Sequence, residues 1–188
     1  PDHKNFWLSE DKNTALVNTR LAIQDLSKNG NQPFISHDKR YILVFNGEIY
    51  NFKILKNKLK EYKFTSNSDT EVLLAAMEEW DIETAIKKSN GMFALAVLDT
   101  DNRKLYFARD RVGKKPLYLY NHPDMLVFSS EIKGILAVPD VKVTISPQAL
   151  TDYLSIGFVI GPQTIYREIT EVRPGTLVEI DLKTQTNR

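Results

Sequence analysis

The sequence predicts an α+β protein whose sheets are mainly antiparallel. Apolar residues recur at helical spacing between residues 52 and 88, and short apolar or aromatic runs follow between residues 92 and 128. The turn-forming segments DTDN, DRVGKKP and NHPD separate these runs, which favours an antiparallel meander. A length of 188 residues with 42% hydrophobic and 26% charged residues is typical of one globular domain and excludes disordered and low-complexity classes.

The first predicted elements are strands followed by a helix. LVNTRLAIQD, residues 16–25, alternates apolar and polar residues and indicates a strand. Arg40–Asn46 is a short run rich in β-forming residues and is typical of a buried strand. Apolar residues at helical spacing, with lysines on the other faces, then predict a helix over residues 52–62.

The next helix has a clear start signal. Ser68 and Glu71 have the spacing of a capping box, in which the Ser hydroxyl and the Glu carboxylate satisfy each other's free backbone N–H groups. We therefore expect a helix from residue 69, with one apolar face formed by Val72, Leu73, Ala76, Met77 and Trp80. A second helical segment, Asp81–Lys88, is expected to end before Gly91.

The second half of the chain is richer in predicted strands. Ser146 followed by Pro147 predicts the start of a helix that runs to about residue 155. Thr176–Asp181 is a last strand, and the polar tail Lys183–Arg188 is interpreted as the start of a linker. The strands of the predicted meander are Met92–Leu98, Lys104–Ala108, Leu117–Tyr120 and Leu126–Phe128.

Composition excludes several classes of function. The 25 Lys and Arg residues nearly balance 24 Asp and Glu residues, so the net charge of +1 provides no global field for nucleic acid or an anionic membrane. The cluster Arg109–Lys115 by itself indicates a solvated turn. The three histidines are scattered and lack the spacing of metal ligands, so no metal site is expected. These features favour small-molecule or protein partners.

The ends and the cysteine content give further expectations. The chain contains no cysteine, which excludes disulfides and a cysteine nucleophile within it. The uncharged run Tyr153–Tyr166 is shorter than the roughly 20 residues of a membrane helix, and no signal peptide is visible, so we expect a cytoplasmic protein. Because the chain opens at Pro1 and not at a methionine, it is expected to be a fragment.

Three parts of the sequence, the run FNGEIYNF and the single residues Asp69 and Arg20, are candidates for chemistry, and each also has a structural explanation. Asn46 and Gly47 favour a tight hairpin turn, although a predicted helix follows within a few residues and Glu48 places a charge in an apolar stretch. Asp69 is explained by the dipole of the helix that it begins. Arg20 is explained as a surface arginine. Taken singly, the structural explanations are preferred.

Five ordered segments together resemble a known family. They are FNGEIYNF, SDTEVLLAAMEEW, NGMFALAVLD, ARDRVGKKPLYLY and FSSEIKGIL. In this order and spacing they resemble the N-terminal glutaminase domain, a class II glutamine amidotransferase, of glutamine-hydrolysing asparagine synthetases. The resemblance implies one such domain over residues 1–188, truncated at its N-terminus, with 183–188 starting a linker to a missing synthetase domain.

The resemblance also implies a fold and a reaction. The fold is a four-layer α/β/β/α sandwich of the N-terminal-nucleophile hydrolase type, with two antiparallel sheets between helical layers. The reaction converts glutamine to glutamate and ammonia, using an opening cysteine whose thiol attacks the amide. Because that cysteine is absent, the fragment is expected to be inactive, whereas the intact protein would be a glutamine-hydrolysing asparagine synthase.

Site residues follow from the resemblance position by position. Arg20 matches the arginine that pairs with the α-carboxylate of glutamine, and Glu48 and Asp69 match the groups that hold its α-ammonium. The side-chain amide of Asn46 and the backbone N–H of Gly47 match the oxyanion hole. Asn18 stands where the family often has a histidine, which is a departure from the pattern.

The implied partners are glutamine and a C-terminal ATP-dependent synthetase domain that amidates aspartate, with a homodimer as a possibility and no nucleic acid or membrane. No cofactor is expected in this domain, and ATP and Mg are expected only in the synthetase domain. Two alternatives stay open: a non-catalytic glutamine-binding or regulatory module of the same fold, and an amidotransferase for another acceptor. A third hypothesis uses the amine of Pro1 as a base, as in small tautomerases.

Overall fold

The computed structural model describes residues 2–184, which divide into two compact units. Unit 1 comprises Pro1–Ala108 and Leu177–Arg188, and unit 2 comprises Arg109–Thr176. Every candidate site residue lies in unit 1. Pro1 and residues 185–188, which include most of the predicted linker and the amine of the tautomerase hypothesis, lie outside the described residues.

Unit 1 is built on a five-stranded sheet. Its strand order is β10-β6-β5-β4-β3. The central strands β4 and β5 are antiparallel in an unbroken register from Tyr41 opposite Asp99 to Ile49 opposite Gly91. The strands are β3 (Phe34–Ile35), β4 (Tyr41–Ile49), β5 (Gly91–Asp99), β6 (Lys104–Arg109) and β10 (Leu177–Asp181).

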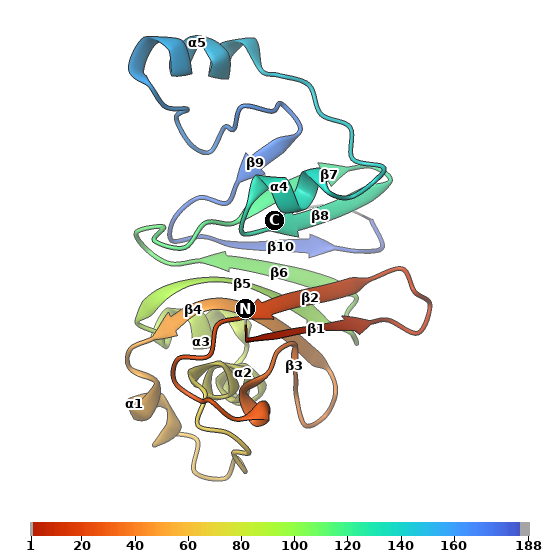
Figure 1. Ribbon diagram of the computed structural model, residues 1–188. Coiled ribbons are helices and arrows are strands. Elements are labelled where there is room, and N and C mark those ends of the chain that lie inside the picture. The colour runs from red at the N-terminus through yellow and green to blue at the C-terminus, as the bar shows by residue number, and fades with distance from the viewer. Residues whose placement is uncertain (1, 185–188) are drawn as a thin grey trace. The chain divides into compact units, whose positions relative to one another are not determined.

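Three helices share one hydrophobic core with this sheet (Figure 1). They are α1 (Phe52–Lys56), α2 (Asp69–Trp80) and α3 (Ile82–Lys88). Successive side chains of a strand point to opposite faces, and the odd-numbered residues Leu43, Phe45 and Ile49 of β4 lie in the core that α2 covers. The even-numbered side chains of β4 therefore point to the other face.

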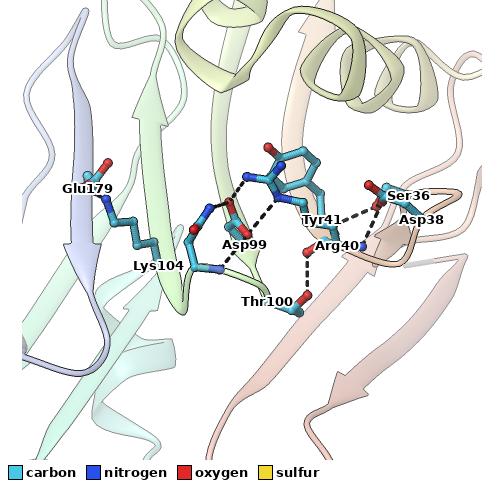
Figure 2. A network of polar contacts seen from close by, with 9 residues as sticks. Ser36, Asp38, Arg40, Tyr41, Asp99, Thr100, Lys104 and Glu179 are labelled. Carbon is cyan, nitrogen blue, oxygen red and sulfur yellow. Dashed lines mark hydrogen bonds and ion pairs between the residues drawn. The ribbon is translucent and has the colours of Figure 1, made fainter.

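A polar network fixes the end of β4 and β5 that is far from the candidate site (Figure 2). Arg40 binds both carboxylate oxygens of the buried Asp99, at 3.1 Å from Nε and 2.7 Å from Nη2. Burial alone raises the pKa of Asp99, but hydrogen bonds from Arg40 and Asn102 outweigh burial and lower it. Lys104 on β6 pairs with Glu179 on β10 at 2.6 Å. The register of the sheet is thus held by paired charges at this end.

A two-stranded hairpin, β1 (His3–Leu8) and β2 (Ala15–Arg20), precedes the sheet, and a short 3-10 helix, η1 (Lys28–Gly30), follows it. The strand predicted over 16–25 therefore ends at Arg20, and the next residues form a loop. Strand β1 was not predicted.

Unit 2 contains a three-stranded antiparallel sheet of order β8-β7-β9 and two helices. Arg109 is only 7% exposed and donates to Lys115 O and Gly113 O, with an ion pair to Glu171. The prediction of a fully solvated basic turn is therefore wrong at Arg109, whose guanidinium organises the loop. The elements are β7 (Tyr118–His122), β8 (Met125–Ser129), α4 (Ile132–Leu136), α5 (Pro147–Ile156) and β9 (Ile169–Glu171).

The α+β class with antiparallel sheets is confirmed, but three local predictions are wrong. The meander is interrupted, because β6 and β7 belong to different sheets and the Arg109 loop separates them. The helix predicted over 52–62 ends at Lys56 and continues as turns. Asn46 and Gly47 lie inside β4 and form no hairpin turn. The helices predicted from 69, 81 and 147 are confirmed within a residue or two.

The capping box is only half present. The Oγ of Ser68 accepts a hydrogen bond from Thr70 N, as an N-cap should. The carboxylate of Glu71 does not return to Ser68. It accepts four hydrogen bonds, from the backbone N–H and hydroxyl groups of Thr65 and Ser66. Glu71 thus fixes the turn that precedes α2.

Candidate functional site

The free edge of β4 is the centre of the candidate site. Hydrogen-bonding groups along an antiparallel strand face its two neighbours alternately. The N–H of Tyr50 donates to the carbonyl oxygen of Asn90, so the backbone groups of even-numbered β4 residues point toward β5. The backbone N–H and C=O groups of the odd-numbered residues therefore point toward the β3 side. Strand β3 pairs only with Ile42 and Leu43, and beyond them the edge has no partner strand among residues 2–184.

Side chains occupy two positions on this edge. The amide of Gln32 bonds to both backbone groups of Phe45, accepting from N at 2.7 Å and donating to O at 3.0 Å. The Oδ2 of Asp69 accepts from Ile49 N at 2.7 Å. Gly47 lies between these two, and its N–H points to the same open edge. The arrangement leaves one backbone donor flanked by an amide and a carboxylate.

A glycine is required at this point of the strand. A Cβ built on Gly47 would lie 2.6 Å from the Cα of Phe93 on the paired strand β5. Because the obstructing atoms are backbone, they cannot rotate away. Asn46 and Glu48, the flanking residues, point to the sheet face opposite the α2 core, where Asn46 is exposed and Glu48 half-buried.

Asp69 approaches this edge from the start of α2. Its side chain is 5% exposed. Burial raises the pKa of the Asp69 carboxyl, hydrogen bonds from Ile49 N and Thr70 N partly offset that effect, and the nearby charge of Glu48 raises the pKa further. The two acidic groups therefore lie close enough to repel each other, and a cation between them would relieve that repulsion.

Arg20 is held by the loop that follows β2. Its Nη1 donates to Ser27 O and Asn31 Oδ1, both at 3.1 Å, and its Nη2 donates to Asp25 O. Gly30 lies against the guanidinium, since a Cβ there would stand 2.9 Å from Cζ of Arg20. The side chain is therefore fixed by three acceptors and a close glycine.

The donors of Arg20 are not exhausted by this loop. A guanidinium carries five N–H groups, and three are used. The two that have no acceptor within residues 2–184 are as many as a carboxylate needs for a bidentate pair. Arg20 can therefore bind an external carboxylate without giving up its own supports.

Two further residues connect the parts of the site. The carboxylate of Asp25 accepts from Ser27 N and from Asn67 N, just before α2. The side chain of Gln24 donates to Glu48 Oε1 at 3.0 Å. The loop after Arg20 is thus joined both to β4 and to the segment that presents Asp69.

Sequence reasoning proposed five of these residues as ligand-binding groups, which stay predictions, and missed the residues that support them. The structure places Asn46, Gly47 and Glu48 in succession on β4 and brings Asp69 to the N–H of the next residue, Ile49. Gln24 joins the Arg20 loop to Glu48. Asn18 lies on β2 opposite Asn5. The missed residues are Gln24, Asp25, Gly30, Asn31 and Gln32. Their residue types are common in loops, so nothing in the sequence marked them except their position beside Arg20.

Neither a metal-binding cluster nor a membrane-spanning helix is present among the residues that the structure describes. Within residues 2–184, no group of three or more histidine and acidic side chains is arranged to hold a metal ion. None of the helices described there is long and apolar enough to cross a membrane.

Comparisons with known proteins identify the family of the chain. A family model described as "Glutamine amidotransferase domain" matches residues 1–188. The chain is 38% identical over 178 residues to asparagine synthetase [glutamine-hydrolyzing] 1 of Bacillus subtilis, a match that covers 94% of the chain and 27% of the relative. It is 34% identical over 201 residues to a putative asparagine synthetase [glutamine-hydrolyzing] 2 of Methanocaldococcus jannaschii, covering 96% and 39%.

A solved structure shows the same fold. The glutamine phosphoribosylpyrophosphate amidotransferase of B. subtilis, complexed with ADP and GMP, superposes with a TM-score of 0.62 at 22% identity over 93% of this chain and 34% of that one. The N-terminal-nucleophile hydrolase fold expected from the sequence is therefore confirmed. The chain spans well under half the length of each of these three proteins.

Proposed function

Because the chain belongs to the glutamine amidotransferase domain family, we propose that the open edge of β4 binds free glutamine and, in the intact protein, positions its amide for hydrolysis. The observation that carries the proposal is that one cation and two acids are joined to an edge of β4 where, within residues 2–184, the N–H of Gly47 faces no partner strand. A free amino acid carries a negative α-carboxylate and a positive α-ammonium. The site offers Arg20 to the carboxylate and the two acids to the ammonium.

Arg20 binds the α-carboxylate through its two remaining N–H groups, as a planar bidentate fork. Glu48 and Asp69 bind the α-ammonium, whose charge also offsets their mutual repulsion. The side chain of glutamine then extends along the edge of β4 toward Asn46 and Gly47. The Asn46 amide and the Gly47 N–H donate to the amide oxygen as negative charge develops on it.

The nucleophile of the proposed reaction is not in this chain, which contains no cysteine. In the intact protein a cysteine thiol attacks the amide carbon, ammonia leaves with a transferred proton, and water hydrolyses the thioester to glutamate. We accordingly expect the 188-residue chain to bind glutamine without hydrolysing it.

The activity of the whole protein is a further part of the proposal. The relatives named as asparagine synthetases are much longer than this chain. This length supports a fused C-terminal domain that uses ATP and Mg to amidate aspartate with the released ammonia. A homodimer, a cytoplasmic location and the absence of a cofactor from the glutaminase domain stay predictions from the sequence. The second candidate from the sequence, a non-catalytic glutamine-binding module of the same fold, predicts that the intact protein binds glutamine without hydrolysing it.

Two experiments test the proposal. Isothermal titration calorimetry of the 188-residue chain with L-glutamine should detect binding that Arg20→Ala abolishes, and an absence of heat with the folded wild-type chain would contradict the site. In the full-length protein, Asn46→Ala should lower glutaminase turnover by roughly 10²- to 10³-fold while ammonia-dependent synthesis is retained. A full-length protein that binds glutamine but never hydrolyses it would favour the binding module.

A further inference from the structure

The side-chain amide of Gln24 donates a hydrogen bond through its nitrogen, whereas its oxygen is buried and has no hydrogen-bond partner among the described residues. Its Nε2 donates to Glu48 Oε1 at 3.0 Å. Its Oε1 is fully buried and accepts no hydrogen bond from the described residues. Because both atoms are bonded to the same carbon and the nitrogen contacts Glu48, the unpaired oxygen lies close to the Glu48 carboxylate.

Rotating the amide by a half-turn does not remove this feature. The exchange would place Oε1 against Glu48, so that two acceptors would face each other, and would bury the NH₂ group in place of the oxygen. A buried acceptor that finds no donor is costly, and native structures contain few of them. We therefore interpret the unpaired oxygen beside Glu48 as an acceptor for a hydrogen-bond donor on a bound ligand.

The number of acceptors agrees with the number of donors on a primary ammonium. An α-ammonium, like the ammonium of lysine, carries three N–H groups. Glu48 and Asp69 supply one acceptor each, which leaves one N–H without a partner. Asp69 Oδ2 accepts from the N–H of Ile49, the residue next to Glu48 on β4, and the hydrogen bond from Gln24 joins its amide to Glu48.

We propose that Gln24 Oε1 is the third acceptor for the α-ammonium and makes the site selective for a free primary amine. This inference rests on the proposed glutamine site and adds a specificity-determining residue to it. Gln24 lies between Arg20 and Asp25, in the loop that also fixes the arginine, so one segment contacts both charged groups of the bound amino acid.

Selectivity between ligands tests the inference. The probes are L-glutamine and glutaramate, which has the same carboxylate and amide but no α-amine. Gln24→Met keeps the length of the side chain and removes the amide. We expect it to weaken L-glutamine binding about tenfold or more, as for one hydrogen bond to a charged donor. Glutaramate binding, followed by saturation-transfer NMR at millimolar ligand, should change by less than twofold.

Controls separate this role from a structural one. Gln24→Ala should give the same selective loss if Gln24→Met folds poorly, and Ile23→Ala, at a neighbouring side chain that is 71% exposed, should leave both ligands unaffected. An equal loss for both ligands, or no loss for glutamine, would overturn the role of Gln24 while leaving the glutamine site intact. If the wild-type chain binds neither ligand, the glutamine site itself fails.

Discussion

The carboxylate of Asp69 at the start of α2 bonds to the backbone N–H of Ile49 at the end of β4, with 2.7 Å between Oδ2 and N. One side chain thereby completes the hydrogen bonding of a strand edge and places a buried negative charge beside it. These two tasks need different properties of the side chain, because the strand needs an acceptor and the proposed ligand needs a charge.

Asp69→Asn separates the two tasks. The amide oxygen of asparagine can still accept from Ile49 N, so the free energy of unfolding should change by no more than about 1 kcal/mol. Glutamine affinity should fall at least tenfold, because the charge that faces the α-ammonium is gone. Calorimetric titration and thermal unfolding measure the two effects. Asp69→Leu, which removes the acceptor as well, should lose stability in addition, and unchanged affinity in Asp69→Asn would contradict the assignment.

Gly30→Ala should displace Arg20. Because a Cβ at residue 30 would lie 2.9 Å from the guanidinium carbon of Arg20, the flexible arginine is the group that moves. We expect glutamine binding to weaken by tenfold or more and the melting temperature to fall no further than in Arg20→Ala, since Gly30 needs no positive φ. If the effect acts through Arg20, Gly30→Ala should have no further effect on binding in an Arg20→Ala background.

Much of unit 1 could be predicted from local patterns, and its contacts could not. The helix from residue 69 followed from Ser68 and its apolar face, because capping and periodicity are properties of neighbouring residues. The extent of β4 could not be predicted from local pattern. Asn46 and Gly47 have the preferences of a turn, but pairing with the whole of β5 keeps them in a strand.

The resemblance named the ligand-facing residues without showing what holds them. Gln32 is adjacent to Phe45 only in the folded chain, and Glu71 bonds to Thr65 and Ser66 in place of the cap that its spacing predicted. Such pairings depend on how distant segments approach each other. The resemblance therefore supplies candidate ligand-binding groups, whereas the groups that position them become visible only in the folded chain.

Replacing Glu71 should lower the stability of the fold. Its buried carboxylate accepts four hydrogen bonds from Thr65 and Ser66. Glu71→Ala leaves these donors without an acceptor, and we expect the free energy of unfolding to fall by at least about 2 kcal/mol. Urea denaturation measures the loss. Glu83→Ala, an exposed glutamate on α3 that pairs with Lys87, should change stability by less than about 0.5 kcal/mol. Equal effects would contradict the importance of the four bonds.

Gly47→Ala should act on the fold before it acts on any ligand. The added Cβ meets the backbone of β5, with 2.6 Å to Cα of Phe93, and strand β4 must shift to admit it. We expect a loss of about 1–3 kcal/mol in the free energy of unfolding, measured by denaturant titration. Asn46→Ala, on the exposed neighbouring position, should retain nearly full stability. If Gly47→Ala were as stable as the wild type, the close approach of the two strands would be wrong.

Glutamine binding should weaken as the pH falls, and Asp69 should be responsible. Burial, with the charge of Glu48, raises the pKa of Asp69 above its ordinary 3.8 in the free domain, whereas a bound ammonium stabilises the carboxylate and lowers that pKa. As the pH falls through the raised value, the free domain takes up a proton that binding must expel. The affinity therefore declines by up to tenfold per pH unit.

The stability of the free domain should respond in the opposite direction. Folded Asp69 binds its proton at a higher pH than unfolded Asp69, so its contribution to stability rises as the pH falls through the folded pKa. The difference between wild type and Asp69→Asn isolates both effects from those of other carboxylates, such as Asp25, whose pKa is lowered by its hydrogen bonds. Titrations with L-glutamine and thermal melts between pH 4 and 8 measure the two differences. Affinity that is equally pH-dependent in Asp69→Asn would show that another group controls binding.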